Sequence, residues 1–317
     1  MRNSTLVLLF SIVCFVSHQS YAQTPNAAIR YYQAGEKKMQ KAEWLGAIED
    51  YTKAIEISSH LNSTRQPNQK MVNGNGFDNS GDITVVDPLT AYAYVRRAVA
   101  YFELREFDAT IADCEKALRI KPQLAAAYLA LGTAWRGKGN DDEALRDYNR
   151  ALVLDENLVE VYNNRGALRH DLGDISGALA DLNRAITLNP RLPEAYYHRG
   201  YVFLQKRDFA SAIRDFNRAL ELRPTFAWAY TGRGTTLMGQ GMITASTKDF
   251  SAALELDPEL AVAYGNRGLA LMVLGRDAEA QSDIEKYIKL KRDPKGELQV
   301  RAELAKRLMH IYKTGVR

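Results

Sequence analysis

The chain has 317 residues and a nearly balanced charge, with 42 basic and 38 acidic side chains and a net charge of +4. This balance does not predict a nucleic-acid-binding surface, which needs an excess of basic side chains. Beyond residue 22 the only cysteine is Cys114, so a framework of intrachain disulfides is excluded.

Residues 1–22 have the pattern of a secretory signal peptide. Arg2 is followed by an apolar run over 6–16, and the segment ends with small residues at Ala22. The run is short for a bilayer span, and an uncleaved membrane anchor is the alternative interpretation. We expect an exported protein, periplasmic or secreted, whose mature chain begins at Gln23.

Three series of residues recur at intervals of 34 in the rest of the chain. The first consists of tyrosines, the second of glycine or alanine and the third of aspartates. Their members are Tyr94, Tyr128, Tyr162, Tyr196, Tyr230 and Tyr264; Ala98, Gly132, Gly166, Gly200, Gly234 and Gly268; Asp113, Asp147, Asp181, Asp215, Asp249 and Asp283. A period of 34 is the length of one helix–turn–helix unit. The sequence therefore predicts an all-α protein, an α-solenoid of about seven stacked hairpins.

One unit, residues 125–158, shows why each half should be helical. Apolar or small residues follow the i, i+3, i+4, i+7 spacing from Tyr128 to Trp135, which predicts an amphipathic helix. After a break at 137–140, a second stripe runs from Ala144 to Ala151. We expect the small residues to let the paired helices approach closely and the large rings to fill the space between hairpins.

Single residues mark where the second helices begin and what they bury. Asp174 and Asp208 stand where such helices should start and are predicted N-caps. Cys114 falls in the apolar stripe of a second helix, and we expect a buried, inert thiol.

The series divide the chain into segments. We assign 1–22 to the signal peptide, 23–61 to a first repeat, 62–90 to a polar insertion rich in Gly and Asn, 91–294 to six contiguous repeats and 295–317 to a capping helix with a basic tail. Residues 284–317 hold ten basic and four acidic side chains. A solvated cap is the simpler interpretation, and docking to an anionic surface is the alternative.

Residues 193–226 carry a resemblance to the tetratricopeptide repeat family. Its signature is an aromatic, a leucine-like and a small residue, a second aromatic, then Ala, an aromatic, Ala and Pro. The chain has Tyr196, Arg199, Gly200, Phe203, Ala212, Phe216, Ala219 and Pro224 at these places. The resemblance implies a right-handed superhelix whose concave groove is lined by the first helices of the hairpins.

An arginine replaces the leucine-like residue in most repeats, and a series aspartate follows it 16 residues later. The arginines are Arg97, Arg165, Arg199, Arg233 and Arg267. We predict a recurring ion pair that ties hairpins together; a charged ligand site is the alternative. Leu131 breaks this series. Arg169, where an aromatic residue was expected, makes local packing less regular.

The resemblance places a set of aromatic, amide and basic side chains in the concave groove. The set is Tyr92, Arg96, Asn163, Asn164, Tyr197, His198, Tyr201, Trp228 and Asn266. Aromatic rings provide contact area at low entropy loss, and amides can bond to a peptide backbone. We therefore expect a protein or peptide partner. The alternative for the rings is packing against the next repeat.

No pattern of residues predicts chemistry. We find no nucleophile elbow and no phosphate-binding glycine loop, and His170 and His198 lack metal-ligand spacing. We expect no catalytic residue, no cofactor and no metal. The sequence predicts a non-catalytic interaction scaffold or adaptor without a nucleic-acid partner, which meets membranes only through an uncleaved anchor or the basic cap. The alternative is a regulatory or substrate-recognition subunit of an enzyme or envelope assembly machine encoded elsewhere.

Overall fold

The computed structural model describes residues 26–64 and 88–291, together with Lys306. The two ranges form fourteen α-helices and contain no strand. The predicted signal peptide, most of the predicted insertion and all of the predicted cap except Lys306 lie outside the described residues. None of the described helices has the length and apolar character needed to cross a membrane.

The described chain divides into two compact units between Asn164 and Arg165, and each is considered by itself. The first unit holds six complete helices and the start of α7. They are α1 (Asn26–Gln40), α2 (Trp44–Thr64), α3 (Pro88–Glu103), α4 (Phe107–Ile120), α5 (Ala125–Lys138) and α6 (Asp141–Leu154). Since α2 and α3 each extend three residues into the predicted insertion, residues 62–64 and 88–90 are helical.

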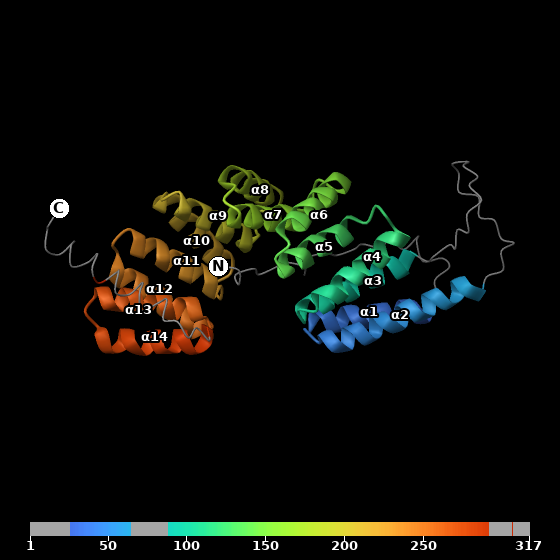
Figure 1. Cartoon of the computed structure of the whole chain (residues 1–317), viewed down its shortest axis with the longest axis horizontal. Helices are drawn as coiled ribbons and strands as arrows, with labels where there is room; N and C mark the ends of the chain where they lie inside the picture. Colours follow the sequence, from blue (N-terminus) through green and yellow to red (C-terminus); the bar gives the residue numbers. More distant parts are fainter. Residues whose placement is uncertain (1–25, 65–87, 292–305, 307–317) are drawn as a thin grey trace. The chain divides into compact units, whose positions relative to one another are not determined.

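The second unit begins within α7 (Val159–Asp171) and continues to the last described helix. Its other helices are α8 (Ile175–Leu188), α9 (Pro193–Gln205), α10 (Phe209–Leu222), α11 (Ala227–Gly239), α12 (Ile243–Leu256), α13 (Ala261–Val273) and α14 (Asp277–Lys291). Figure 1 shows that each odd-numbered helix pairs with the even-numbered helix that follows it. The prediction of an all-α solenoid of helical hairpins is confirmed. The expected right-handed course of the superhelix stays a prediction.

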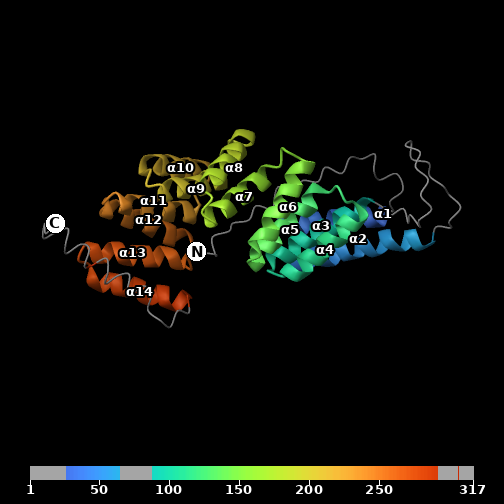
Figure 2. The ribbon, with the colours of Figure 1, turned by 45° about the horizontal axis from the view of Figure 1, so that its top comes forward.

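The two kinds of helix pack differently within each unit. Odd-numbered helices contact the next odd-numbered helix, as α9 does α11 and α11 does α13, which Figure 2 shows in neighbouring places. Among the described helices, no pair of even-numbered helices makes comparable contact. We call the face that the odd-numbered helices of a unit form its odd-helix wall. This wall is the tighter side of each unit, while the even-numbered helices stand further apart.

Close approach within a hairpin depends on the glycine series. A Cβ atom added at Gly200 would lie 2.9 Å from the ring of Phe216, and one at Gly132 would lie 2.7 Å from the ring of Tyr148. In the α3–α4 hairpin the series has Ala98, which packs in one cluster with the small Cys114. A small partner in the second helix therefore leaves room for the extra methyl group.

The predicted caps and the predicted buried thiol are confirmed. The Asp174 carboxylate accepts a hydrogen bond from the Gly177 amide at 2.9 Å, and Asp208 accepts one from the Ser211 amide at 3.1 Å. Both aspartates thus satisfy an amide that the first turn of the helix leaves unpaired. Cys114 is fully buried, and burial raises the pKa of its thiol, which keeps it protonated and unreactive.

Candidate functional site

The arginine and aspartate series form the predicted ion pairs, each within one hairpin. In the α9–α10 hairpin Arg199 donates from Nε and Nη2 to the two carboxylate oxygens of Asp215, at 2.7 and 2.8 Å. The same two-point geometry joins Arg97 to Asp113, Arg165 to Asp181, Arg233 to Asp249 and Arg267 to Asp283. These arginines are structural, because their fixed planar donors are already used by buried carboxylates.

Four of these arginines also reach the preceding even-numbered helix, namely Arg97, Arg199, Arg233 and Arg267. Arg199 Nη1 donates to Asn183 of α8 at 2.7 Å, and Arg233 Nη1 donates to Asn217 of α10 at 2.8 Å. Hydrogen bonding to Asp215 raises the pKa of Arg199, so its charge is retained at any physiological pH. Each of these four arginines therefore joins its own hairpin to the hairpin before it.

The α5–α6 hairpin lacks this ion pair because Leu131 takes the place of the arginine. Its series aspartate, Asp147, has a side chain that is only 7% exposed and meets Arg150 of its own helix at 3.1 Å. Burial raises the pKa of Asp147 although Arg150 opposes the shift. The α7–α8 hairpin shows the opposite departure, since Arg169 brings a second guanidinium to Asp181 at 2.9 Å.

In the first unit the predicted groove residues are engaged within the fold. Arg96 is buried, and its Nε and Nη2 donate to the Glu36 carboxylate at 2.6 and 2.8 Å, which joins α3 to α1. Tyr92 is half-buried, and its hydroxyl accepts a hydrogen bond from Lys121 at 2.6 Å. Arg96 is therefore occupied by a carboxylate of the chain itself.

Two neighbouring asparagines of α7 are also buried. Asn163 donates from Nδ2 to Oδ1 of Asn164 at 3.2 Å. Asn163 Oδ1 and Asn164 Nδ2 are buried without a hydrogen-bond partner among the described residues. Their polar atoms do not reach the surface, so they cannot contact a partner without local movement.

In the second unit an aromatic cluster lies on the odd-helix wall. Tyr197 is buried, with its ring 5.0 Å from Phe226 and 5.1 Å from Tyr201. Tyr201 stands edge-on to Phe216 at 5.3 Å and keeps part of its surface exposed, as does Trp228, which packs against the same cluster. Burial raises the pKa of Tyr201 to about 12, although a hydrogen bond with Tyr197 opposes the shift.

Only some of the predicted groove residues have exposed surface that a partner could contact. Tyr92, Tyr201, Trp228 and Asn266 are partly exposed, whereas Arg96, Asn163, Asn164, Tyr197 and His198 are buried. Asn266 donates to Thr235 at 3.1 Å and so joins α13 to α11. On the odd-helix wall of the second unit, the partly exposed Tyr201 and Trp228 pack against the aromatic cluster.

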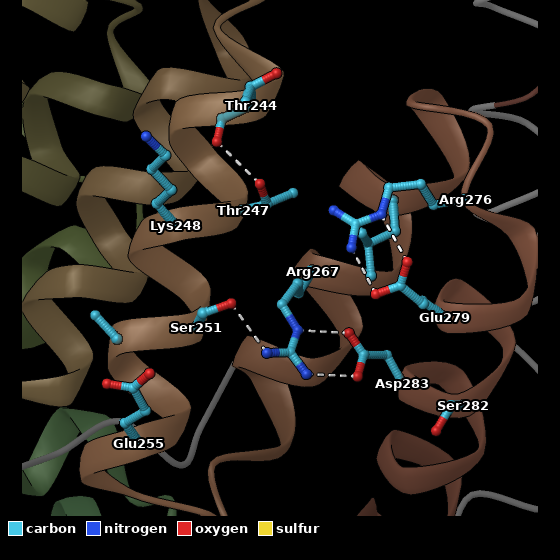
Figure 3. Close-up of a pocket in the computed structure, with 12 residues that line it drawn as sticks. Thr244, Thr247, Lys248, Ser251, Glu255, Arg267, Arg276, Glu279, Ser282 and Asp283 are labelled. Atoms are coloured by element: carbon cyan, nitrogen blue, oxygen red, sulfur yellow. Dashed lines mark hydrogen bonds and ion pairs between the residues drawn. The ribbon is translucent and has the colours of Figure 1, made fainter.

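A cavity of about 740 Å³ lies elsewhere in the second unit, between α12 and α14. Figure 3 shows Arg267 of α13 between Ser251 of α12 and Asp283 of α14, with hydrogen bonds to both. Lys248 and Glu255 line the α12 side of this cavity. We call it the α12–α14 pocket.

Sequence reasoning missed this pocket, although the 34-residue period holds a signal for it. A further position is basic in the other hairpins from α4 onward, with Lys116, Arg150, Arg184, Arg218 and Lys286, but in α12 it is Ala252. Ala252 lines the pocket, and no long side chain from that position fills the space. The replacement of a long basic residue by Ala252 is thus the sequence signal that could have predicted the pocket.

Within residues 26–64 and 88–291, no group of three or more His, Cys, Asp or Glu is arranged to hold a metal ion. His170 lies 3.9 Å from Asp171, its neighbour in sequence.

Comparison with protein families gives a consistent assignment. Tetratricopeptide repeat families match residues 91–124, 193–226 and 261–294, and a TPR repeat family matches 136–173 and 168–207. Together these matches cover half of the chain. A comparison with curated proteins gives no match.

Solved structures share the fold. A tetratricopeptide repeat protein from Parabacteroides merdae has a TM-score of 0.61 at 15% identity, over 89% of this chain and 99% of its own. PilF of Pseudomonas aeruginosa has a TM-score of 0.58 at 22% identity, over 68% and 97%. PilW, a type IV pilus biogenesis factor, has a TM-score of 0.59 at 20% identity, over 66% and 97%.

Proteins built from this repeat are in general non-catalytic scaffolds for protein–protein interaction. The 34-residue period and the paired helices agree with the family matches, which fall on residues of five of the seven described hairpins. The chain belongs to the tetratricopeptide repeat family.

Proposed function

We propose that the chain is a non-catalytic adaptor that binds a peptide segment or a protein subunit on the odd-helix wall of its second unit. The observation that carries this proposal is the pair of partly exposed rings, Tyr201 and Trp228, beside a packed aromatic cluster. Rings that are held in place by their neighbours lose little entropy on binding, and such anchors commonly dominate an interface.

The chemistry of this surface suits a peptide better than a charged small molecule. The partly exposed rings of Tyr201 and Trp228 supply apolar area for the side chains of a peptide. The nearby charged residues Arg199 and Arg233 are occupied by Asp215 and Asp249. Contact area would therefore provide most of the affinity.

A double substitution tests this surface. We expect Tyr201→Ala with Trp228→Ala to abolish partner capture, because truncation of each anchor should weaken binding by about 2 kcal/mol. The matched control is Phe209→Ala with Tyr287→Ala, which removes two partly exposed rings from the even-numbered helices of the same unit. Capture is measured by immunoprecipitation from the native host, and thermal unfolding of each variant is measured alongside.

The two variants separate the possible outcomes. Loss of capture in the Tyr201/Trp228 variant alone, with an unfolding temperature close to wild type, supports the proposal. Equal capture by both variants would place the binding surface elsewhere. A large drop in the unfolding temperature of the Tyr201/Trp228 variant would show that these rings belong to the packing between repeats.

We further propose that the protein acts outside the cytoplasm, in the periplasm or as a secreted protein. The support is the basic, apolar and small-residue pattern of residues 1–22. Intact-mass analysis of protein from the native host should give a chain that begins at Gln23. A mass that retains residues 1–22 would contradict cleavage and favour an anchor.

A further inference from the structure

The α12–α14 pocket is open because the side chains that face it from α12 are short. Ser251 and Ala252 stand where the preceding hairpin has Asn217 and Arg218, and a methyl group or a hydroxyl replaces each longer chain. Its volume of about 740 Å³ lies within the range of about 300–1,000 Å³ that is typical of ligand sites. The hollow is large enough for several residues of a peptide.

Two charged side chains at this pocket are unpaired among the described residues. Lys248 and Glu255 form no hydrogen bond or ion pair with any described residue, whereas Arg267 is held by Asp283 and Ser251, and Arg276 by Glu279. Glu255 follows Lys248 by seven positions on α12, so the two residues lie on the same helical face, with their backbones about 10.5 Å apart along the axis. The pocket therefore has a positive end and a negative end (Figure 3).

We propose that the α12–α14 pocket binds an extended peptide segment that carries an acidic and a basic side chain three residues apart. In a polyproline II helix, residues i and i+3 lie on one face and about 9.3 Å apart, close to the rise of about 10.5 Å along α12 between Lys248 and Glu255. In a β-strand, residues of one face lie about 6.7 or 13 Å apart, which fits less well. The acidic side chain pairs with Lys248 and the basic one with Glu255.

The remaining lining of the pocket suits such a segment. A polyproline II backbone has no internal hydrogen bonds, so its N–H and C=O groups are free to bond to a partner. The hydroxyls of Thr244 and Ser282 line the pocket and bond to no other described residue. Leu271 and Ala252 add an apolar surface for the two residues between the charges. Proline or alanine is best suited to those places.

This site is separate from the surface proposed above for the partner. The pocket is formed by α12, α13 and α14, while Tyr201 and Trp228 lie on α9 and α11, and the two sets share no residue. A protein with both sites could hold one segment on each side of the second unit. The two proposals can therefore fail independently.

The test uses the full chain and a fluorescently labelled peptide with the core Glu-Pro-Pro-Lys, titrated by anisotropy at low ionic strength. Wild type should bind it, and Lys248→Glu should weaken binding about tenfold, because attraction of the acidic side chain turns into repulsion. Lys206→Glu is the matched control, since Lys206 is an exposed lysine of the same unit outside the pocket, and it should change binding less than twofold.

Charge rescue makes the assignment specific. The Lys248→Glu variant should bind a Lys-Pro-Pro-Lys peptide better than wild type does, because both ends of its pocket are acidic. A peptide with Glu and Lys adjacent should bind wild type more weakly than Glu-Pro-Pro-Lys. The Tyr201→Ala, Trp228→Ala double variant should bind Glu-Pro-Pro-Lys as wild type does.

Several results would overturn the proposal. These are no measurable binding of Glu-Pro-Pro-Lys to wild type, an equal loss in the Lys248→Glu and Lys206→Glu variants, or no rescue by Lys-Pro-Pro-Lys. Loss of peptide binding in the Tyr201/Trp228 double variant would assign the peptide to the odd-helix wall instead.

Discussion

The α5–α6 hairpin and the α9–α10 hairpin follow one plan but differ in how they satisfy a buried aspartate. Both have a glycine in the first helix against a ring of the second, Gly132 with Tyr148 and Gly200 with Phe216. In the α9–α10 hairpin the buried Asp215 receives two hydrogen bonds from Arg199. In the α5–α6 hairpin Leu131 provides none.

This difference shows which interaction defines the hairpin and which one adds further stability to it. The glycine and ring are present in both, so close packing defines the hairpin itself. The arginine is present only in the α9–α10 hairpin, so a hairpin can form without the ion pair, which adds stability where it occurs. The consequence of its lack is visible at Asp147, since burial raises the pKa of that carboxyl. Substitutions in the two hairpins can test this division.

The largest effect is expected at the feature that both hairpins share. Gly200→Leu should destabilise the protein by about 3 kcal/mol, because a Cβ atom there already lies 2.9 Å from the Phe216 ring and the rest of the side chain has no space. Neighbouring repeats are coupled, so the loss should spread along the unit. Urea unfolding monitored by circular dichroism measures it.

Ala210→Leu is the control for this substitution. Ala210 lies on α10 of the same hairpin and is exposed, so a larger side chain there meets solvent. We expect its unfolding free energy to stay within about 0.5 kcal/mol of wild type. Equal stability of the Gly200→Leu variant and wild type would refute close approach at Gly200.

A smaller effect is expected when the α9–α10 hairpin is made to resemble α5–α6. Arg199→Leu removes both hydrogen bonds to Asp215, whose side chain is 8% exposed, and the bond to Asn183. Breaking a fully buried pair destabilises by about 3–5 kcal/mol, and the partial exposure of Arg199 reduces our expectation to about 2 kcal/mol. Arg214→Leu, an exposed arginine of α10, is the control in the same urea experiment. Equal losses in the two variants would show that the pair contributes nothing.

The smallest effect, and the sharpest contrast, concerns the two aspartates. Because the folded protein holds the Asp147 proton more tightly than the unfolded chain does, stability from this group is present at low pH and is lost as pH rises above the unfolded pKa of about 3.9. Asp147→Asn should therefore gain stability relative to wild type as pH rises toward neutral. Asp215→Asn should lose about 1.5 kcal/mol at neutral pH, since Arg199 loses a charged partner.

Unfolding free energies measured from about pH 3 to pH 7 for wild type and both variants check this contrast. Opposite signs at neutral pH are the expected result. If the Asp147→Asn variant is less stable than wild type at pH 7, Arg150 compensates fully for the burial of the Asp147 carboxylate.

Much of the fold could be predicted from the sequence because it depends on residues that recur at a fixed spacing. The period located the helix pairs, the glycine at each close approach and the arginine–aspartate pairs, all of which involve residues within one repeat or adjacent repeats. The N-caps at Asp174 and Asp208 were predictable for a similar reason, since a cap is a local feature.

The candidate site was harder to predict because exposure depends on partners that the period does not specify. Arg96 is buried by its pairing with Glu36, which lies 60 residues earlier, beyond a segment that interrupts the period. Tyr197 is buried by Phe226, which precedes the next repeat. The α12–α14 pocket depends on the absence of a large side chain at Ala252, and such an absence is visible only when the series is compared across hairpins.

Site-specific photo-crosslinking can show directly whether the odd-helix wall of the second unit holds the partner. A photoreactive phenylalanine replaces Trp228 in one variant and Phe209, on α10, in another, and adducts formed in the native host are mapped by mass spectrometry. We expect an adduct at position 228 that maps to one defined segment of a partner protein, and none at position 209. Adducts at position 209 alone, or equal adducts at both positions, would show that the partner does not bind at the odd-helix wall.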